Sequence, residues 1–264
     1  MQSVHKYGYA FQAFFQQEYL PALNANVRPP MMEGFKSFIN VPKIAQAIQV
    51  TFEQQLAEGK AEEYDTHPSL KERIAALQDL PEGRIADERP ASVLIADIPD
   101  AEKIILESIA ADKTAMQALK TVGWEEMTER VYLPQWEQTV STFSTALASL
   151  KSADLPQIAA QNADFFYKLC AAGNILPPNV SVSQVSAEDQ HRIVGSILGR
   201  AVAVALHRAG WAIQTGPGEG VLLVNGDKKL EPFPVYENLA NRDLSADAWR
   251  KTCADLGISD LKLA

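Results

Sequence analysis

The sequence contains very little cysteine. Only Cys170 and Cys253 occur in 264 residues, far apart and in no Cys-x-x-Cys pair. A disulfide-rich scaffold is therefore excluded. We expect both residues to be reduced structural thiols in a cytosol-like compartment, because neither lies in a recognisable nucleophile context.

The sequence also lacks an apolar run of the ~18 residues that a membrane span requires. The best candidate, residues 193–206, contains Arg200 and the polar Ser196, so it predicts a buried helix. We expect no direct membrane span in this chain, which should be soluble. Residues 1–7 lack the basic and apolar regions of a signal peptide, and the chain has the character of one that begins within a longer protein.

Basic residues are in deficit. Lys and Arg number 24 against 33 Asp and Glu, for a formal charge of -9 with no local basic cluster. Nucleic acid and anionic membrane surfaces are therefore poor partners. Hydrophobic residues at 47% and charged residues at 22% are typical of a folded globular chain, and the length favours two domains.

Common catalytic and metal-binding motifs are missing. None of the four histidines begins a His-Glu-x-x-His segment, and His191 and His207, sixteen residues apart in one expected helix, fall on roughly opposite faces. A Gly-x-Ser-x-Gly elbow is absent, and the glycines of residues 216–220 lack the Gly-Lys-Ser/Thr ending of a phosphate loop. Zinc needs at least three converging protein ligands, so we expect no metal site or cofactor in this chain alone.

Helical periodicity is what the sequence does contain. Within residues 1–80, apolar residues recur three and four positions apart between proline and glycine breaks. The expected helices cover residues 4–23, 32–39 and 44–56, followed by one that Thr66 caps with Pro68 in its first turn. Residues 81–90, with two proline-containing breaks and no apolar periodicity, form the expected linker.

Residues 91–264 form the expected C-terminal domain, which is mainly helical. A short strand is expected at residues 92–96, and Ser186 and Ser245 should cap helices that end at Gly210 and Gly257. Between these helices, at about residues 211–232, period-two patterning predicts an antiparallel meander with a type I′ turn at residues 225–227. The expected fold class is mainly α with a small antiparallel β meander near the C-terminus, that is, α+β.

The segment Tyr64-Asp-Thr-His-Pro-Ser-Leu-Lys-Glu-Arg-Ile-Ala-Ala-Leu77 carries a resemblance to a known family. Its Thr-His-Pro-x-Leu-x-x-Arg-Ile-x-x-Leu string resembles the segment that closes the peptidase domain of HtpX-like and CaaX prenyl-endopeptidase-type zinc metallopeptidases. The strings Tyr19-Leu-Pro-Ala-Leu, Arg28-Pro-Pro and Glu33-Gly-Phe, and weaker ones in the tail, are similar to a bacterial branch of zinc-dependent proteases with chaperone function.

The resemblance implies that two histidines of His-Glu-x-x-His and a downstream Glu hold zinc in the intact enzyme, and that the Glu of the motif activates water. This sequence contains neither the motif nor a convincing third ligand. The chain therefore resembles the C-terminal portion of a membrane-anchored enzyme on the cytoplasmic side, catalytically incompetent by itself. Its implied partners are the upstream zinc-binding segment and a protein or peptide substrate.

The same resemblance implies that His67 and Arg73 lie near the active-site cleft of the intact enzyme, where they could bind the substrate carbonyl or the oxyanion. The structural interpretation is that His67 caps and packs while Arg73 forms a surface ion pair. Two alternatives for the whole chain stay open: a non-enzymatic protein- or peptide-interaction module that uses residues 91–264, and a pseudo-peptidase that never had a zinc helix.

The expected linker generates a first prediction. Limited proteolysis should cut first between Pro81 and Pro90, because exposed segments with few contacts are the preferred sites of nicking. Mass spectrometry of the first fragments locates the cut. Early cleavage elsewhere, with residues 81–90 protected, would argue for one merged core.

Overall fold

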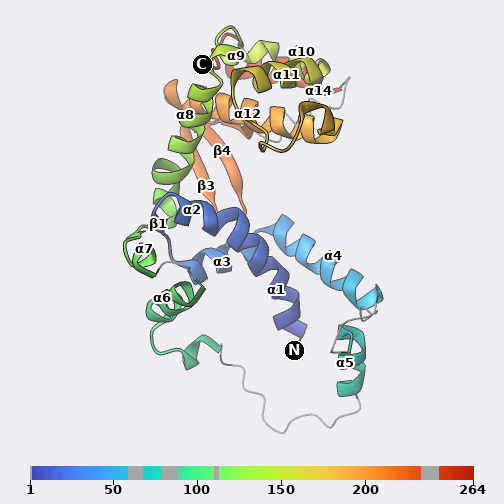
Figure 1. The fold of residues 1–264 in the computed structure, drawn as a ribbon, viewed down its shortest axis with the longest axis vertical. Helices are drawn as coiled ribbons and strands as arrows, with labels where there is room; N and C mark the ends of the chain where they lie inside the picture. Colours follow the sequence, from blue (N-terminus) through green and yellow to red (C-terminus); the bar gives the residue numbers. More distant parts are fainter. Residues whose placement is uncertain (1, 59–67, 79–88, 90, 110–112, 233–243) are drawn as a thin grey trace. The chain divides into compact units, whose positions relative to one another are not determined.

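Helices account for most of the chain. The computed structural model describes residues 2–58, 68–78, 89, 91–109, 113–232 and 244–264. It is 69% helical with a small three-stranded antiparallel sheet within residues 212–230, which confirms the expected fold class (Figure 1). The chain divides into two units, residues 1–124 with 216–219 and residues 125–215 with 220–264.

The first unit begins with a helical path that contains a wide turn. α1 (Gln2–Phe14) runs into the π-helix η1 (Phe15–Tyr19) and then into α2 (Leu20–Asn24), where the sequence predicted one regular helix over residues 4–23. Pro21 explains the difference, because it has no N–H to donate to the carbonyl four residues earlier and its ring crowds that carbonyl. The π-turn before it accommodates the misfit.

Further short elements complete the first unit. α3 and α4 correspond to the helices expected at 32–39 and 44–56, whereas a 3₁₀ turn replaces the strand expected at 92–96. The elements are α3 (Met31–Asn40), α4 (Pro42–Glu58), α5 (Leu70–Gln78), the 3₁₀ helix η2 (Ala91–Leu94), α6 (Ile98–Ile109) and α7 (Lys113–Gln117), with β1 (Val27–Arg28) paired in parallel to β2 (Lys120–Thr121).

Aromatic rings form the centre of the first unit's core. Phe14 is fully buried, and the centroids of the rings of Tyr19, Phe35, Phe38 and Trp124 lie 5.7–6.0 Å from its own. Tilted aromatic pairs at such distances contribute beyond their buried area. The stripe of aromatic residues that the sequence places on α1 is therefore the packing surface of that helix.

A carboxylate from α6 caps the start of α3. The N-cap residue, Pro30, makes no side-chain hydrogen bond, and the two oxygens of Glu102 instead accept the backbone N–H groups of Met31 (3.1 Å) and Met32 (2.7 Å). Negative charge at a helix N-terminus is favourable, and these two N–H groups have no partner within the helix. Residues of α6 thus belong to the same packing unit as α3.

This contact explains the extent of the first unit. The indole N–H of Trp124 also donates to the Pro30 carbonyl at 2.8 Å, so residues up to 124 pack with the N-terminal helices. The units consequently differ in extent from the predicted domains 1–80 and 91–264. Residues 81–88 and 90 lie outside the described residues, so the linker at 81–90 stays a prediction.

The second unit is built on one long helix. α12 (Ala187–Arg208) is buried almost continuously from Val194 to Leu206, and α8, α11 and β4 pack on it (Figure 1). The other elements are η3 (Trp124–Glu126), which starts at the last residue of the first unit, the π-helix η4 (Thr128–Tyr132), α8 (Leu133–Thr142), α9 (Ser144–Leu147), η5 (Ser152–Asp154), α10 (Leu155–Ala160), α11 (Asn162–Ala172), η6 (Val182–Gln184), β3 (Ala212–Gly216), β4 (Gly220–Asn225), β5 (Lys228–Leu230) and α14 (Leu244–Leu256).

Both ends of α12 form as the sequence predicts. The hydroxyl oxygen of Ser186 accepts the backbone N–H of Asp189 at 3.1 Å, which satisfies one of the first N–H groups of the helix. Gly210, with φ of 88°, follows the last turn in the left-handed region that glycine tolerates without strain.

The meander has the expected order but a different turn. The strands are ordered β3-β4-β5, and Asn225 pairs with Lys228, so Gly226 and Asp227 are the central turn residues. Gly226 has φ of 60°, whereas Asn26 is the non-glycine residue with positive φ in the described part of the chain. A type I′ turn needs positive φ at both central residues, so that prediction is wrong and the turn fits type II′.

The C-terminal helix and tail are held by a buried serine. The N–H of Ser152 donates to the Leu261 carbonyl at 2.9 Å, its hydroxyl donates to the Ile258 carbonyl, and its own carbonyl accepts the indole N–H of Trp249 at 2.7 Å. Ser245 lies inside α14, which already includes Leu244, so the expected N-cap is wrong. Gly257, with φ of 72°, follows the helix as expected.

Two helical glycines of the first unit generate a prediction with opposite signs. A Cβ at Gly34 would overlap the indole ring of Trp124, whereas a Cβ at Gly8 would meet no atom within 4 Å. Gly34→Ala should destabilise by about 1–3 kcal/mol through overpacking, and Gly8→Ala should stabilise by up to about 1 kcal/mol through helix propensity. Urea unfolding followed by circular dichroism measures both, and equal shifts would contradict the close packing at Gly34.

Candidate functional site

The described part of the segment that carries the family resemblance, from residue 68 onward, contains a capped helix. Ser69 and Glu72 make a reciprocal capping box at the start of α5: the Ser69 N–H donates to the Glu72 carboxylate at 2.8 Å, and the Glu72 N–H donates to the Ser69 hydroxyl at 3.3 Å. The helix begins at Leu70, so Pro68 precedes it and does not occupy its first turn. Ser69 is therefore the cap, and the expected cap, Thr66, lies outside the described residues.

Of the two predicted site residues, the structure describes one. Arg73 lies in the first turns of α5, half-buried, and its backbone N–H donates to the Ser69 carbonyl at 3.0 Å. His67 lies outside the described residues, so its position relative to Arg73 stays a prediction. The capping box sets where the helix starts, and Arg73 therefore lies one turn after the cap residue Ser69.

The apolar face of α5 is only partly covered. Ile74 is half-buried, and Leu77, one turn later on the same face, is 45% exposed. The described contacts of α5 within the first unit are with α4. This helix therefore presents apolar surface next to Arg73.

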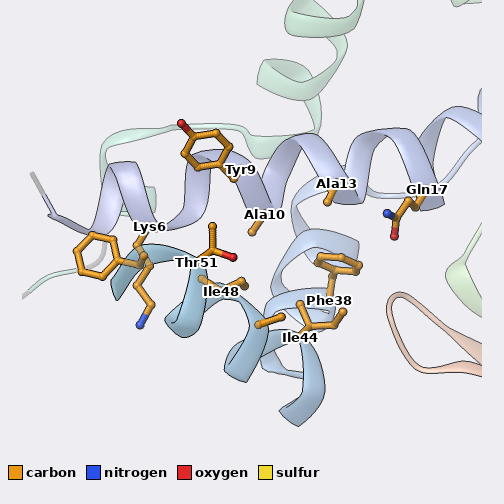
Figure 2. A pocket seen from close by; sticks show the side chains of 11 residues that line it. Lys6, Tyr9, Ala10, Ala13, Gln17, Phe38, Ile44, Ile48 and Thr51 are labelled. Atoms are coloured by element: carbon orange, nitrogen blue, oxygen red, sulfur yellow. The ribbon is translucent and has the colours of Figure 1, made fainter. Parts of the chain in front are cut away.

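A pocket between α1 and α4 lies in the same unit and was not predicted from the sequence. Its volume is about 260 Å³. Figure 2 shows Ala10 and Ala13 of α1 facing Ile44 and Ile48 of α4, with Phe38 of α3 at one end. The small alanine side chains leave space where a larger residue would fill the contact between the helices. Spacing alone could not reveal this, because alanine suits both helix formation and close packing.

Polar side chains also contribute to the lining of this pocket, namely Lys6, Tyr9, Gln17 and Thr51. The ammonium of Lys6 donates to the Gln49 side-chain oxygen at 2.7 Å, and the Gln49 amide donates to the Glu53 carboxylate at 2.6 Å. Lys6 also lies 5.8 Å from the centroid of the Tyr7 ring. Lys6 is thus held by Gln49, which with Glu53 lies outside the lining, and most of the lining residues are apolar, so the pocket suits apolar contact.

The remaining chemistry-bearing side chains show no catalytic arrangement. Burial raises the pKa of the Cys253 thiol to about 11 and that of Cys170 above its ordinary value, which disfavours the reactive thiolate. In the described ranges, no three His, Cys, Asp or Glu side chains come close enough together to hold a metal ion. The described helices also include none that is both long and apolar enough to cross a membrane.

Comparisons with models of protein families, with curated proteins and with solved structures found no significant match to this chain.

The capping box of α5 generates a prediction of pH dependence. Hydrogen bonds from the backbone and hydroxyl of Ser69 lower the pKa of Glu72 from its ordinary value of 4.5. A carboxylate with a lowered pKa stabilises the folded helix start above its ordinary pKa, and this stabilisation is lost as the pH falls through the lowered value. The amide proton of Ser69, followed by NMR, should therefore titrate with a midpoint below 4.5.

Glu72→Gln should abolish this titration and keep α5, because glutamine also serves in a capping box. Lys71→Gln, at the neighbouring exposed position, should leave the midpoint nearly unchanged. A midpoint at or above the ordinary value in the unmodified chain would contradict the capping geometry.

Proposed function

We propose that this chain is the C-terminal, non-catalytic region of a membrane-anchored zinc metalloendopeptidase whose intact form hydrolyses peptide bonds on the cytoplasmic side of the membrane. The supporting observation is α5, where the resemblance of residues 64–77 coincides with a capped helix that holds Arg73 half-buried beside an incompletely covered apolar face. In the proposal, the upstream peptidase segment covers that face.

In the intact enzyme, Arg73 and His67 act as auxiliary groups. A guanidinium has five N–H donors and stays protonated, so Arg73 can donate hydrogen bonds to a substrate carbonyl and to the negative charge that develops on its oxygen. The segment before α5 must bring His67 toward the same cleft, because helical geometry alone would place positions 67 and 73 about 120° from a shared face.

Zinc belongs to the upstream segment in this proposal. The side chains of the described residues do not fit a zinc site, since they hold no converging set of three ligands. We therefore assign no zinc ligand to this chain, and the isolated chain is expected to hold no stoichiometric zinc and to cleave no peptide.

The test uses the intact protein with its upstream segment. Arg73→Ala and His67→Ala should each lower kcat by roughly 10²–10³-fold, the usual effect of losing an oxyanion contact, while zinc content and Tm stay unchanged. Lys71→Ala is the matched control on the same helix and should keep full turnover. Peptidase assays, elemental analysis and thermal unfolding give the three readouts.

If the Arg73 and His67 variants melt several degrees lower and cleave at the normal rate, the two residues are structural and the site assignment is wrong. The reading frame upstream of Met1 tests the larger proposal separately. A His-Glu-x-x-His segment there supports a peptidase, and a start codon preceded by no coding sequence argues for the alternatives.

A second candidate function is a non-enzymatic peptide-interaction module, placed here on the first unit and not on residues 91–264 as the sequence suggested. The pocket between α1 and α4 favours it, because a mostly apolar cavity of about 260 Å³ suits an apolar side chain of a bound peptide (Figure 2). Ala13→Leu should fill this pocket and abolish peptide capture, while peptidase activity of the intact protein would be unaffected by a peptide site of this kind.

A further inference from the structure

A larger cavity in the second unit is lined in part by a half-buried arginine, Arg200. Its volume is about 490 Å³, within the range of about 300–1,000 Å³ typical of small-molecule sites. Residues of α8 and α12 and the segment after α11 line it, and the side chains used below are Gln138, Thr139, Phe143, Asn174, Ile193 and Arg200. All of them belong to the second unit.

Arg200 is the unusual member of this lining. It lies on α12 between the buried residues Gly199 and Ala201 and is itself half-buried. Its described hydrogen bond is a long one, 3.3 Å from Nη1 to the hydroxyl oxygen of Thr139, which donates its own proton to the Gln135 carbonyl at 2.9 Å. Within the described residues, no carboxylate lies within ion-pair distance of Arg200.

The partial burial of this guanidinium removes water from its charge, and no described carboxylate offsets the lost hydration. Desolvation lowers the pKa of Arg200 from its ordinary value, yet arginine remains protonated in proteins. A buried charge is costly unless it is paired and hydrogen-bonded, and an apolar residue of similar size would remove that cost. An unpaired guanidinium beside a cavity suggests that its counter-ion is a ligand.

The rest of the lining restricts the class of ligand. Arg192, the other cation at the cavity, is exposed and already pairs with Asp189 at 2.7 Å. One positive charge thus remains, together with the neutral donors of Gln138 and Asn174 and an apolar wall that includes Phe143 and Ile193. One uncompensated cation favours a singly charged anion, whereas phosphate carries more charge than a lone guanidinium balances.

We propose that this cavity binds a small molecule with one carboxylate on an apolar body, and that the guanidinium of Arg200 holds the carboxylate. The planar guanidinium matches a carboxylate through two parallel N–H···O bonds, and the apolar wall receives the hydrocarbon part. A free carboxylic acid and the C-terminal carboxylate of a peptide share this chemistry. The inference is independent of the proposed function.

The test is calorimetric titration of the full chain with hexanoate, with hexanamide and with inorganic phosphate. Hexanoate should bind saturably, and hexanamide and phosphate at least tenfold more weakly. A pentapeptide that ends in leucine, with a free or an amidated C-terminus, distinguishes a peptide carboxylate from a free acid as the natural source. Equal binding of acid and amide, stronger binding of phosphate, or no binding of either carboxylate overturns the proposal.

Arg200→Met should abolish binding and leave Tm unchanged or raised, because it removes a partly buried, uncompensated charge. Arg208→Met is the matched control, since it makes the same change at an exposed position of the same helix outside the cavity. Undiminished hexanoate binding by the folded Arg200→Met variant would overturn the proposal. If that variant fails to fold, Arg200→Lys decides: at least tenfold weaker hexanoate binding supports the proposal, and undiminished binding overturns it.

Discussion

The burial of the second half of α12, from Ile197 to Leu206, is the constraint on which the second unit depends. A helix that is apolar around its whole circumference must be covered around its whole circumference. α8, α11 and β4 each pack on α12. The serine cap at one end and the left-handed glycine at the other fix which residues enter the core.

Arg200 lies within this apolar stretch of α12. Desolvation of its guanidinium costs free energy, and no carboxylate among the described residues forms an ion pair that would offset it. A sequence selected only for stability would place a hydrophobic side chain there. The two compartments of the chain thus differ in character: the first unit offers a mostly apolar pocket, and the second offers a cavity with one unsatisfied charge. In our proposals, the pocket between α1 and α4 selects a ligand by its shape, and the cavity at Arg200 selects a ligand by its charge.

Local patterning predicted the helices, the meander and the caps at Ser186 and Gly257, because each depends on residues adjacent in sequence. Local patterning did not predict a helix cap when the capping residue was distant in sequence, or when two nearby residues could each serve as the cap. Glu102 caps α3 from about 70 positions away, a contact that no local pattern contains. Ser69 caps α5 because Glu72 returns its hydrogen bond. The sequence shows Arg200 as an interruption of an apolar run. Only the three-dimensional structure shows that no described carboxylate pairs with it.

In each unit, a π-turn directly precedes a helix that has proline in its first turn. Each π-turn ends at the tyrosine of a Tyr-Leu-Pro tripeptide, Tyr19-Leu-Pro in the first unit and Tyr132-Leu-Pro in the second. In a regular helix, residues five apart point about 140° away from each other, but the wider turn brings both inward. In the first unit, the step of five from Phe14 to Tyr19, both fully buried, spans such a turn. A Tyr-Leu-Pro tripeptide thus lies at the end of a widened helical turn in each unit.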